Sequence, residues 1–125
     1  MKKVIIIGAS GHGKVVADII QKSGDKVYGF LDDNTELADE FLGFPILGKI
    51  ENYKKYKDMA VFIIAIGDAH VRSDISRKLQ NVGLYTAIHP SAVISGLDVT
   101  IFKGTVILGF AVFIPGSCLG VFCII

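Results

Sequence analysis

The sequence predicts an α/β domain with a parallel sheet, followed by the start of a parallel β-helix. Two observations carry this prediction. Short apolar segments alternate with helical patterns over residues 1–88, and a period of six residues runs through the tail. A chain of 125 residues is long enough for one ordinary domain, or for a small domain and part of another. We therefore expect one unit over residues 1–88 and a second over residues 89–125.

Composition and charge limit the classes of function. The net charge is +1, from 13 basic and 12 acidic residues. This balance gives no sign of the excess positive charge that binds nucleic acid or an anionic membrane. Hydrophobic residues make up 51% of the chain, so a packed core is expected rather than disorder. The first apolar run is too short for a signal peptide. We expect a cytoplasmic protein without a metal site, in which Cys118 and Cys123 are reduced, buried thiols.

The first unit begins with a strand and a glycine-rich loop. Residues 3–7 are a short apolar run bounded by glycine, which is typical of a buried strand. Residues 8–13, called the glycine loop below, follow this strand. Apolar residues then recur near helical spacing, and Gly24 is expected to end the helix. Residues 26–31 predict a second strand, which ends in a polar turn at residues 32–34.

The rest of the first unit continues the alternation. The expected elements are a short strand at 44–47, a brief helix at 50–56, a strand buried on both faces at 59–66, a helix at 70–82 and a last strand at 85–88. Gly83 is expected to end the second long helix. Because crossovers between parallel strands are right-handed, helices should cover both faces of a parallel sheet.

The glycine loop is the first candidate for ligand binding. Its glycines free the backbone to approach a phosphate at a helix N-terminus, and the alternative is a tight turn without a ligand. Their spacing is G-x-x-G-x-G rather than the usual G-x-G-x-x-G. Ser10 either caps the helix or donates to a phosphate. The glycines in question are Gly8, Gly11 and Gly13.

Two further polar loops should lie beside the glycine loop, because the carboxyl ends of parallel strands meet at one edge of a sheet. Asp32 and Asp33 lie about 20 residues after the loop. In nucleotide-binding domains of this class, a carboxylate at that position accepts a hydrogen bond from a ribose hydroxyl. The alternative is a solvated turn. Gly67 would let the backbone approach a ligand. Asp68 is a candidate cap for the next helix, and Arg72 is expected to be solvated or to face an anion.

A bulky apolar residue recurs every six residues in the tail, and a small residue follows four places after each of the first four. The bulky residues are Ile101, Ile107, Phe113, Leu119 and Ile125, and the small ones are Thr105, Ala111, Ser117 and Cys123. Hexapeptide repeats are typical of parallel β-helices, where each hexad forms one side of a triangular coil and the bulky residue points inward. The tail supplies little more than one turn of such a coil, so we expect the chain to stop inside a domain.

A membrane-anchoring helix is the rival hypothesis for the tail. No charged residue occurs from Gly104 to Ile125, and this stretch is about as long as a bilayer-spanning helix. Pro115, several glycines and the β-favouring residues of the tail argue against a helix. The six-residue period favours the coil.

These stretches together resemble the NeuD/PglD-type sugar acetyltransferases. The matching stretches are IIIGASGHGKVVADI near the start, FLDDN at 30–34, IAIGDAHVR at 64–72 and HPSAVIS at 89–95, and the hexads continue the match. The resemblance implies a Rossmann-like, sugar-nucleotide-binding domain of the PglD N-terminal type over residues 1–88. It implies an incomplete left-handed β-helix acyltransferase domain over residues 89–125.

The resemblance also implies a function. Such enzymes transfer the acetyl group of acetyl-CoA to a nucleotide-linked or sialic-acid-type sugar in surface glycan synthesis, and they are homotrimers. Their general base is a histidine on the coil, and the matching stretch would lie beyond Ile125. We therefore assign no catalytic residue and expect the chain as given to lack acetyl transfer. The implied binding residues for a UDP-sugar are Gly8, Ser10, Gly11, His12, Gly13, Asp32, Asp33 and Gly67.

Some positions depart from the family pattern, and two other functions stay open. Phe102, Phe110 and Ile114 stand where the family has small or polar residues, so this coil surface is unusually apolar. One alternative is a UDP-sugar-binding module without catalysis. The other is an NAD-dependent oxidoreductase. Three points argue against the oxidoreductase. The tail carries hexads, a substrate domain is lacking, and we expect no Tyr-x-x-x-Lys pair of the short-chain dehydrogenase kind.

Overall fold

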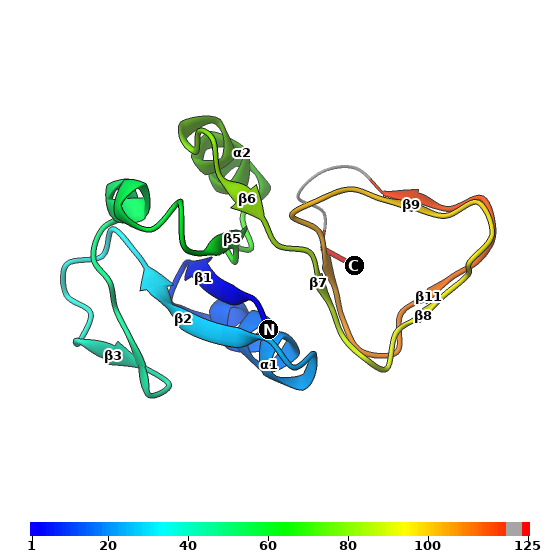
Figure 1. Ribbon diagram of the computed structural model, residues 1–125, viewed down its shortest axis with the longest axis horizontal. Helices are drawn as coiled ribbons and strands as arrows, with labels where there is room; N and C mark the ends of the chain where they lie inside the picture. Colours follow the sequence, from blue (N-terminus) through cyan, green and yellow to red (C-terminus); the bar gives the residue numbers. More distant parts are fainter. Residues whose placement is uncertain (120–123) are drawn as a thin grey trace.

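A four-stranded parallel sheet is the centre of the first unit in the computed structural model, which describes residues 1–119 and 124–125 (Figure 1). Its strand order is β2-β1-β5-β6, and every neighbouring pair for which a register is defined is parallel. The strands are β1 at Lys3–Ile7, β2 at Lys26–Leu31, β5 at Val61–Ile64 and β6 at Gly83–Leu84. The predicted α/β class is therefore confirmed.

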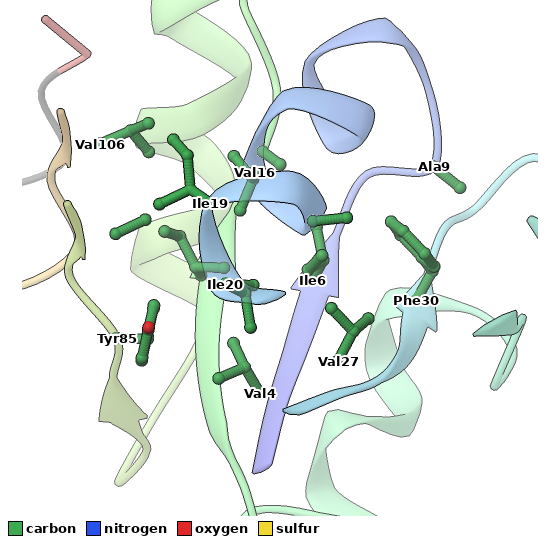
Figure 2. Packing of buried hydrophobic residues seen from close by; sticks show 14 residues of the cluster. Val4, Ile6, Ala9, Val16, Ile19, Ile20, Val27, Phe30, Tyr85 and Val106 are labelled. Carbon is green, nitrogen blue, oxygen red and sulfur yellow. The ribbon is translucent and has the colours of Figure 1, made fainter. Parts of the chain in front are cut away.

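The helix α1, Gly11–Lys22, covers one face of the sheet (Figure 1). Figure 2 shows Val16, Ile19 and Ile20 of this helix facing the β1 residues Val4 and Ile6, with which they share one buried cluster. Burying each of these side chains contributes roughly 1.5–3 kcal/mol, so the apolar stripe of the helix fixes its place on the sheet. The helix ends just before Gly24, as predicted.

The 3-10 helix η1, Ile50–Lys55, and the helix α2, Ala69–Lys78, contribute to the core on the opposite face. Tyr53 of η1 and Ile75 of α2 belong to a second buried cluster together with the other β1 residues. Residues 4–7 of β1 are all fully buried, alternately in the two clusters. A strand covered on both faces needs a continuous apolar run, which is why this segment was recognisable.

A hairpin follows β2. Its strands are β3, Glu40–Phe41, and β4, Phe44–Pro45, and they pair in antiparallel fashion. Leu42 and Gly43 between them have φ of 56° and 80°, as a two-residue hairpin turn of this kind requires. The strand predicted at 44–47 is thus real but shorter, and Ile46 adds a single parallel bridge to Phe30 of β2.

Two predicted elements near the end of the first unit were wrong in extent. The helix predicted over 70–82 ends at Lys78, because the chain is already extended at Leu79, which packs into the second cluster. Gly83 therefore does not end the helix but begins β6. The strand predicted at 85–88 does not close the sheet. Its last two residues form β7, Ala87–Ile88, which pairs with the coil.

The tail forms a parallel coil with a triangular outline (Figure 1). Ala87 pairs with Val106 and Thr100 with Cys118, so about three hexads complete one turn. Among the described residues, no helix is long and apolar enough to cross a membrane. The strand pairs are β7 with β10 (Val106–Ile107), β8 (Val93–Ile94) with β11 (Val112–Phe113), and β9 (Thr100–Ile101) with β12 (Cys118–Leu119).

The hexad positions are buried to different degrees. Ile107 and Thr105 are fully buried, whereas Ile101 and Phe113 are half-buried. Ile125 was expected to point inward but is 43% exposed. Leu119 and the two cysteines lie outside the described side chains, so the predictions for them are not tested.

The corners of the coil also recur every six residues. Asp98, Gly104, Phe110 and Gly116 all have φ between 52° and 89°, the left-handed region of the backbone. Glycine adopts this conformation without strain, whereas for most other residues it costs roughly 1–2 kcal/mol. Phe110 therefore occupies a strained corner, and its side chain is 88% exposed.

Candidate functional site

The glycine loop lies at the carboxyl edge of the sheet, between β1 and α1. The strand order reverses at β1, because β2 lies on one side of β1 and β5 on the other. In open α/β sheets, ligands bind in the crevice at such a switch point, outside the carboxyl ends of the strands. The ends of β1 and β5 therefore define the candidate site.

Packing explains two of the three loop glycines. Gly8 has φ of 114°, and a Cβ there would lie 2.7 Å from the carbonyl oxygen of Ala65. A Cβ on Gly13 would collide with the carbonyl oxygen of Gly8. Gly11 is different, because it is exposed and a Cβ there would have no described atom within 4 Å. Gly11 thus keeps open space at the N-terminus of α1.

Ser10 precedes α1 at the N-cap position, with an extended backbone. Its side chain makes no capping hydrogen bond, so the capping alternative for this residue was wrong. Because the first backbone N–H groups of a helix have no partner within the helix, they are available to an anion. The exposed hydroxyl of Ser10 lies at the same end of the helix.

Asp32 and Asp33 hold the ends of neighbouring segments together. The carboxylate of Asp32 accepts hydrogen bonds from the backbone N–H of Ala9 and of Asn34, each at 2.8 Å, one on each oxygen. Asp33 accepts a bond of 2.9 Å from the backbone N–H of Ile50, where η1 begins. The expectation that these loops meet at one edge is therefore correct for Asp32 and the glycine loop.

The turn after β5 is ordered by two side chains of its own segment. Asp68 caps α2, as predicted, by accepting bonds of 2.9 and 3.0 Å from the backbone N–H of His70 and Val71. The bond from Val71 is the main cause that lowers the pKa of Asp68 below its usual value. Gly67 is exposed, with no described atom within 4 Å of a Cβ placed on it.

Arg72 folds back toward the sheet. Its Nη1 donates to the carbonyl oxygens of Ile66, at 3.1 Å, and of Gly67, at 2.8 Å. Its Nε is buried, and the residue is only half-exposed. Arg72 is thus only partly solvated, because its guanidinium group is held by two carbonyl oxygens of the turn after β5.

His12 lies in the first turn of α1 and is half-buried. Its Nε2 is buried and has no hydrogen-bond partner in the described part of the chain. Burial is the main cause that lowers the pKa of His12, and the positive charge of Arg72 lowers it further. The neutral imidazole is therefore favoured at this site.

A cleft of about 890 Å³ opens at the same edge, on the side of η1 and α2. Gly8, Asp32 and Asp33 line it, but the other predicted binding residues do not. Sequence analysis missed the polar lining contributed by η1 and α2, because tertiary packing alone brings these helices together. That lining includes Lys49, Glu51, Lys54, Asp74, Lys78 and Gln80.

A Tyr-x-x-x-Lys spacing does occur, contrary to expectation, at Tyr53 and Lys57. The Tyr53 ring is buried against Phe62, and its hydroxyl donates to the carbonyl oxygen of Lys78 at 3.1 Å. This tyrosine therefore stabilises the second cluster. Among the described residues, no three His, Cys, Asp or Glu side chains are grouped so that they could hold a metal ion.

Curated proteins that are similar to this chain include one enzyme and one uncharacterized protein. A UDP-N-acetylbacillosamine N-acetyltransferase from Bacillus subtilis (strain 168) is 35% identical over 115 residues, which cover 86% of this chain and 52% of that protein. Uncharacterized protein L142 of Acanthamoeba polyphaga mimivirus is 34% identical over 122 residues, covering 98% of this chain and 24% of that protein. The chain thus spans about half and about a quarter of the length of these two relatives.

Solved structures that are similar over 99% of the chain include two acetyltransferases. A mutant of perosamine N-acetyltransferase from Caulobacter crescentus, in complex with CoA and GDP-perosamine, matches with a TM-score of 0.90 and 30% identity. The acetyltransferase domain of PglB from Neisseria gonorrhoeae FA1090 matches with a TM-score of 0.85 and 28% identity. The chain covers 60% and 62% of these two structures.

The model of one protein family, described as the PglD N-terminal domain, matches residues 3–79. This range contains the sheet strands β1, β2 and β5, the glycine loop and both carboxylates after β2. The match covers more than half of the chain and confirms the resemblance noted in the sequence. The chain therefore belongs to the PglD N-terminal domain family.

Proposed function

We propose that this chain supplies the nucleotide-sugar-binding unit and the first part of the coil of an acetyl-CoA-dependent sugar acetyltransferase. The supporting observation is the match over 99% of the chain, at a TM-score of 0.90, to an N-acetyltransferase bound to CoA and GDP-perosamine. A match of this extent includes both the sheet and the coil. Their relative placement in this chain is thus the placement found in such an enzyme.

In this proposal, residues 1–88 bind a UDP-sugar or a similar nucleotide-linked or sialic-acid-type sugar. The open backbone at Gly11 and the N-terminus of α1 receive the diphosphate, helped by the hydroxyl of Ser10. Gly8, Gly13 and Asp32 hold the loop in shape, since their contacts are internal. His12, in the first turn of α1, and Gly67, in the turn after β5, contribute to the same site. The lining of the cleft contacts the nucleoside.

Acetyl-CoA supplies an acetyl thioester. The amine or hydroxyl of the sugar attacks its carbonyl carbon and loses a proton, the C–S bond breaks, and CoA leaves as the thiol. Residues 89–125 provide part of the coil along which this co-substrate lies. The fit is supported by the paired residues Val93 and Val112, which are both exposed and form an apolar strip for the pantetheine arm. In this proposal the enzyme is a cytoplasmic homotrimer, in which neighbouring coils cover the exposed apolar residues.

The match to an N-acetyltransferase over both the sheet and the coil disfavours a dinucleotide-dependent oxidoreductase. Asp32 holds the glycine loop in shape through its bonds from two backbone N–H groups. A binding module without catalysis would use the same crevice, so an acetyl-transfer assay on the protein in its natural full length separates it from the enzyme.

Calorimetric titration with UDP, GDP and NADH, one at a time, tests the ligand class. We expect UDP or GDP to bind and NADH not to bind. Gly11→Ala sharpens the test, since the new methyl group meets no described atom but enters the space assigned to the diphosphate. It should weaken nucleotide binding while the fold is retained. Gly96→Ala, at an equally open coil position, is the matched control. NADH binding alone would overturn the proposal.

A further inference from the structure

Two buried side-chain nitrogens near the switch point have no hydrogen-bond partner in the described part of the chain. They are Nε2 of His12 and Nε of Arg72. Buried polar atoms in native proteins nearly always have a partner, so each such atom calls for an explanation. The two residues come from α1 and α2, which pack on opposite faces of the sheet and begin at the same edge.

Arg72 is held in a fixed position. Its Nη1 donates two hydrogen bonds, to the carbonyl oxygens of Ile66 and Gly67. Both acceptors belong to the turn directly after β5, so the guanidinium group is anchored at the switch point. A guanidinium group has donors only and stays protonated in proteins. The partner of its Nε–H must therefore be an acceptor.

His12 can provide that acceptor only as a neutral imidazole, in which one ring nitrogen is a donor and the other an acceptor. Burial and the nearby charge of Arg72 both lower the pKa of His12, so the neutral form is favoured. Other charged or titratable groups near the loop are Asp32 after β2, Lys14 on α1, and Asp68 and His70 at the start of α2. Asp32 and Asp68 are engaged with backbone N–H groups.

We propose that Arg72 is a positioning residue for His12. Because the two nitrogens are not bonded to each other directly, its Nε–H binds Nε2 of His12 through one bridging water, and this fixes the neutral imidazole with its proton on Nδ1. The Nδ1–H group then serves as an oriented donor toward the bound nucleotide sugar. This last step rests on the proposed function, whereas the state of the ring does not.

Nitrogen-15 NMR of the histidine rings in the whole chain tests the state of the ring. The chain has three histidines, at positions 12, 70 and 89, so the spectrum is simple to assign. A neutral histidine side chain in water favours the Nε2–H form, so an Nδ1–H form at His12 is diagnostic. We expect that form in the wild-type protein, persisting to lower pH than for an ordinary histidine. An Nε2–H form in the wild-type protein would overturn the proposal without any variant.

Three arginine variants separate charge from hydrogen bonding. Arg72→Gln should shift His12 toward the Nε2–H form and let it become protonated at higher pH. Arg72→Lys keeps the charge but has no Nε–H, so the ring should lose its fixed form while remaining hard to protonate. Arg77→Gln is the control, because Arg77 lies on the same helix but is exposed and paired with Asp74. An unchanged His12 signal in a folded Arg72→Gln protein would contradict the proposal.

Titration of the same proteins with UDP and with GDP tests the link to the ligand. Arg72→Gln should weaken binding by about tenfold, equivalent to about 1.4 kcal/mol. The added control Lys22→Gln, which breaks an exposed ion pair with Asp18 at the far end of α1, should not change it. Unchanged binding together with a changed ring signal would refute the donor role of His12 and leave the proposed function standing. If neither nucleotide binds the wild-type protein, the proposed function fails, while the NMR result still decides the state of the ring.

Discussion

The sheet and the coil use their apolar residues in different ways. The four residues 4–7 of β1 are all fully buried, alternately in two clusters. In the described part of the coil, the outward positions Val93 and Val112 are 60% and 64% exposed, whereas Val106 and Ile107 are buried, and Val106 packs in the cluster that contains α1. The sheet is therefore stable through its own contacts, whereas the outer coil has apolar surface left for another molecule.

The largest expected effect comes from removing a core side chain of the sheet. Phe30 is fully buried, and its ring meets that of Phe41 edge-on at 5.1 Å between centroids. Phe30→Ala should lower the free energy of unfolding by about 3–5 kcal/mol, because it leaves a cavity. Chemical denaturation measures this loss. Phe110→Ala, at an exposed position of the coil, should hardly change the free energy of unfolding. Equal losses of this free energy in both variants would contradict the difference in burial between sheet and coil.

A smaller loss is expected at the glycine loop. Gly8→Ala places a methyl group 2.7 Å from the carbonyl oxygen of Ala65 and forces a left-handed backbone on alanine. The free energy of unfolding should fall by about 1–3 kcal/mol, as measured by thermal or chemical unfolding. Gly11→Ala lies three residues away and should leave stability unchanged or raise it, because alanine favours the helix. A lower free energy of unfolding in Gly11→Ala would show that the loop is packed more tightly than described.

The junction between sheet and coil should contribute less again. The hydroxyl of Tyr85 donates to the carboxylate of Asp25 at 2.7 Å, and the same carboxylate accepts from the backbone N–H of Lys2. Tyr85→Phe should cost about 1 kcal/mol at neutral pH, because Asp25 is only partly buried and water can replace the lost donor.

The pH dependence of this junction follows from Asp25. The bonds from Lys2 and then Tyr85 lower the pKa of Asp25 from its ordinary value of 3.8. Because the folded pKa is the lower one, the contribution is complete above the ordinary value and is lost as the pH falls through the folded value. Unfolding curves of Tyr85→Phe and of the wild type, measured from pH 6 down to pH 2, should therefore converge at the acid end. A constant difference would mean that the hydroxyl does not act through Asp25.

The smallest effect is expected at a corner of the coil, and it has the opposite sign. Phe110 has φ of 64° with an exposed side chain. Phe110→Gly should raise the free energy of unfolding by up to about 1 kcal/mol, since relief of strain exceeds the added freedom of the unfolded chain. Phe102→Gly removes a similar exposed ring at an ordinary backbone conformation and should not stabilise. Equal effects at both positions would mean that corner strain is negligible.

Much of the fold could be predicted because its signals are local. The strands at 3–7 and 26–31 coincide with the observed ones, as bounded apolar runs identify buried strands. The period of six in the tail likewise predicts the coil, and Asp68 caps its helix as its position suggested. Each of these features depends on residues that are close together in the sequence.

The errors concern features that distant contacts decide. The second long helix stops at Lys78 because Leu79 packs into the core, and periodicity does not reveal which sheet accepts residues 87–88. In the same way, nothing in the sequence shows that Arg72 turns back to the end of β5, or that both oxygens of Asp32 are engaged. The cleft beside η1 and α2 is another product of tertiary packing.

The regular corners of the coil give insertions and deletions very unequal consequences. Deletion of one residue from a flat side would exchange the inward and outward side-chain positions as far as the next corner, because successive side chains of a strand point in opposite directions. A residue gained at a corner would only lengthen a loop. The first turn of the coil already contains one extra residue, because β8 and β9 begin seven residues apart, whereas the other neighbouring strands of the coil begin six residues apart. Its surplus is absorbed near Leu97, an exposed residue next to the corner at Asp98.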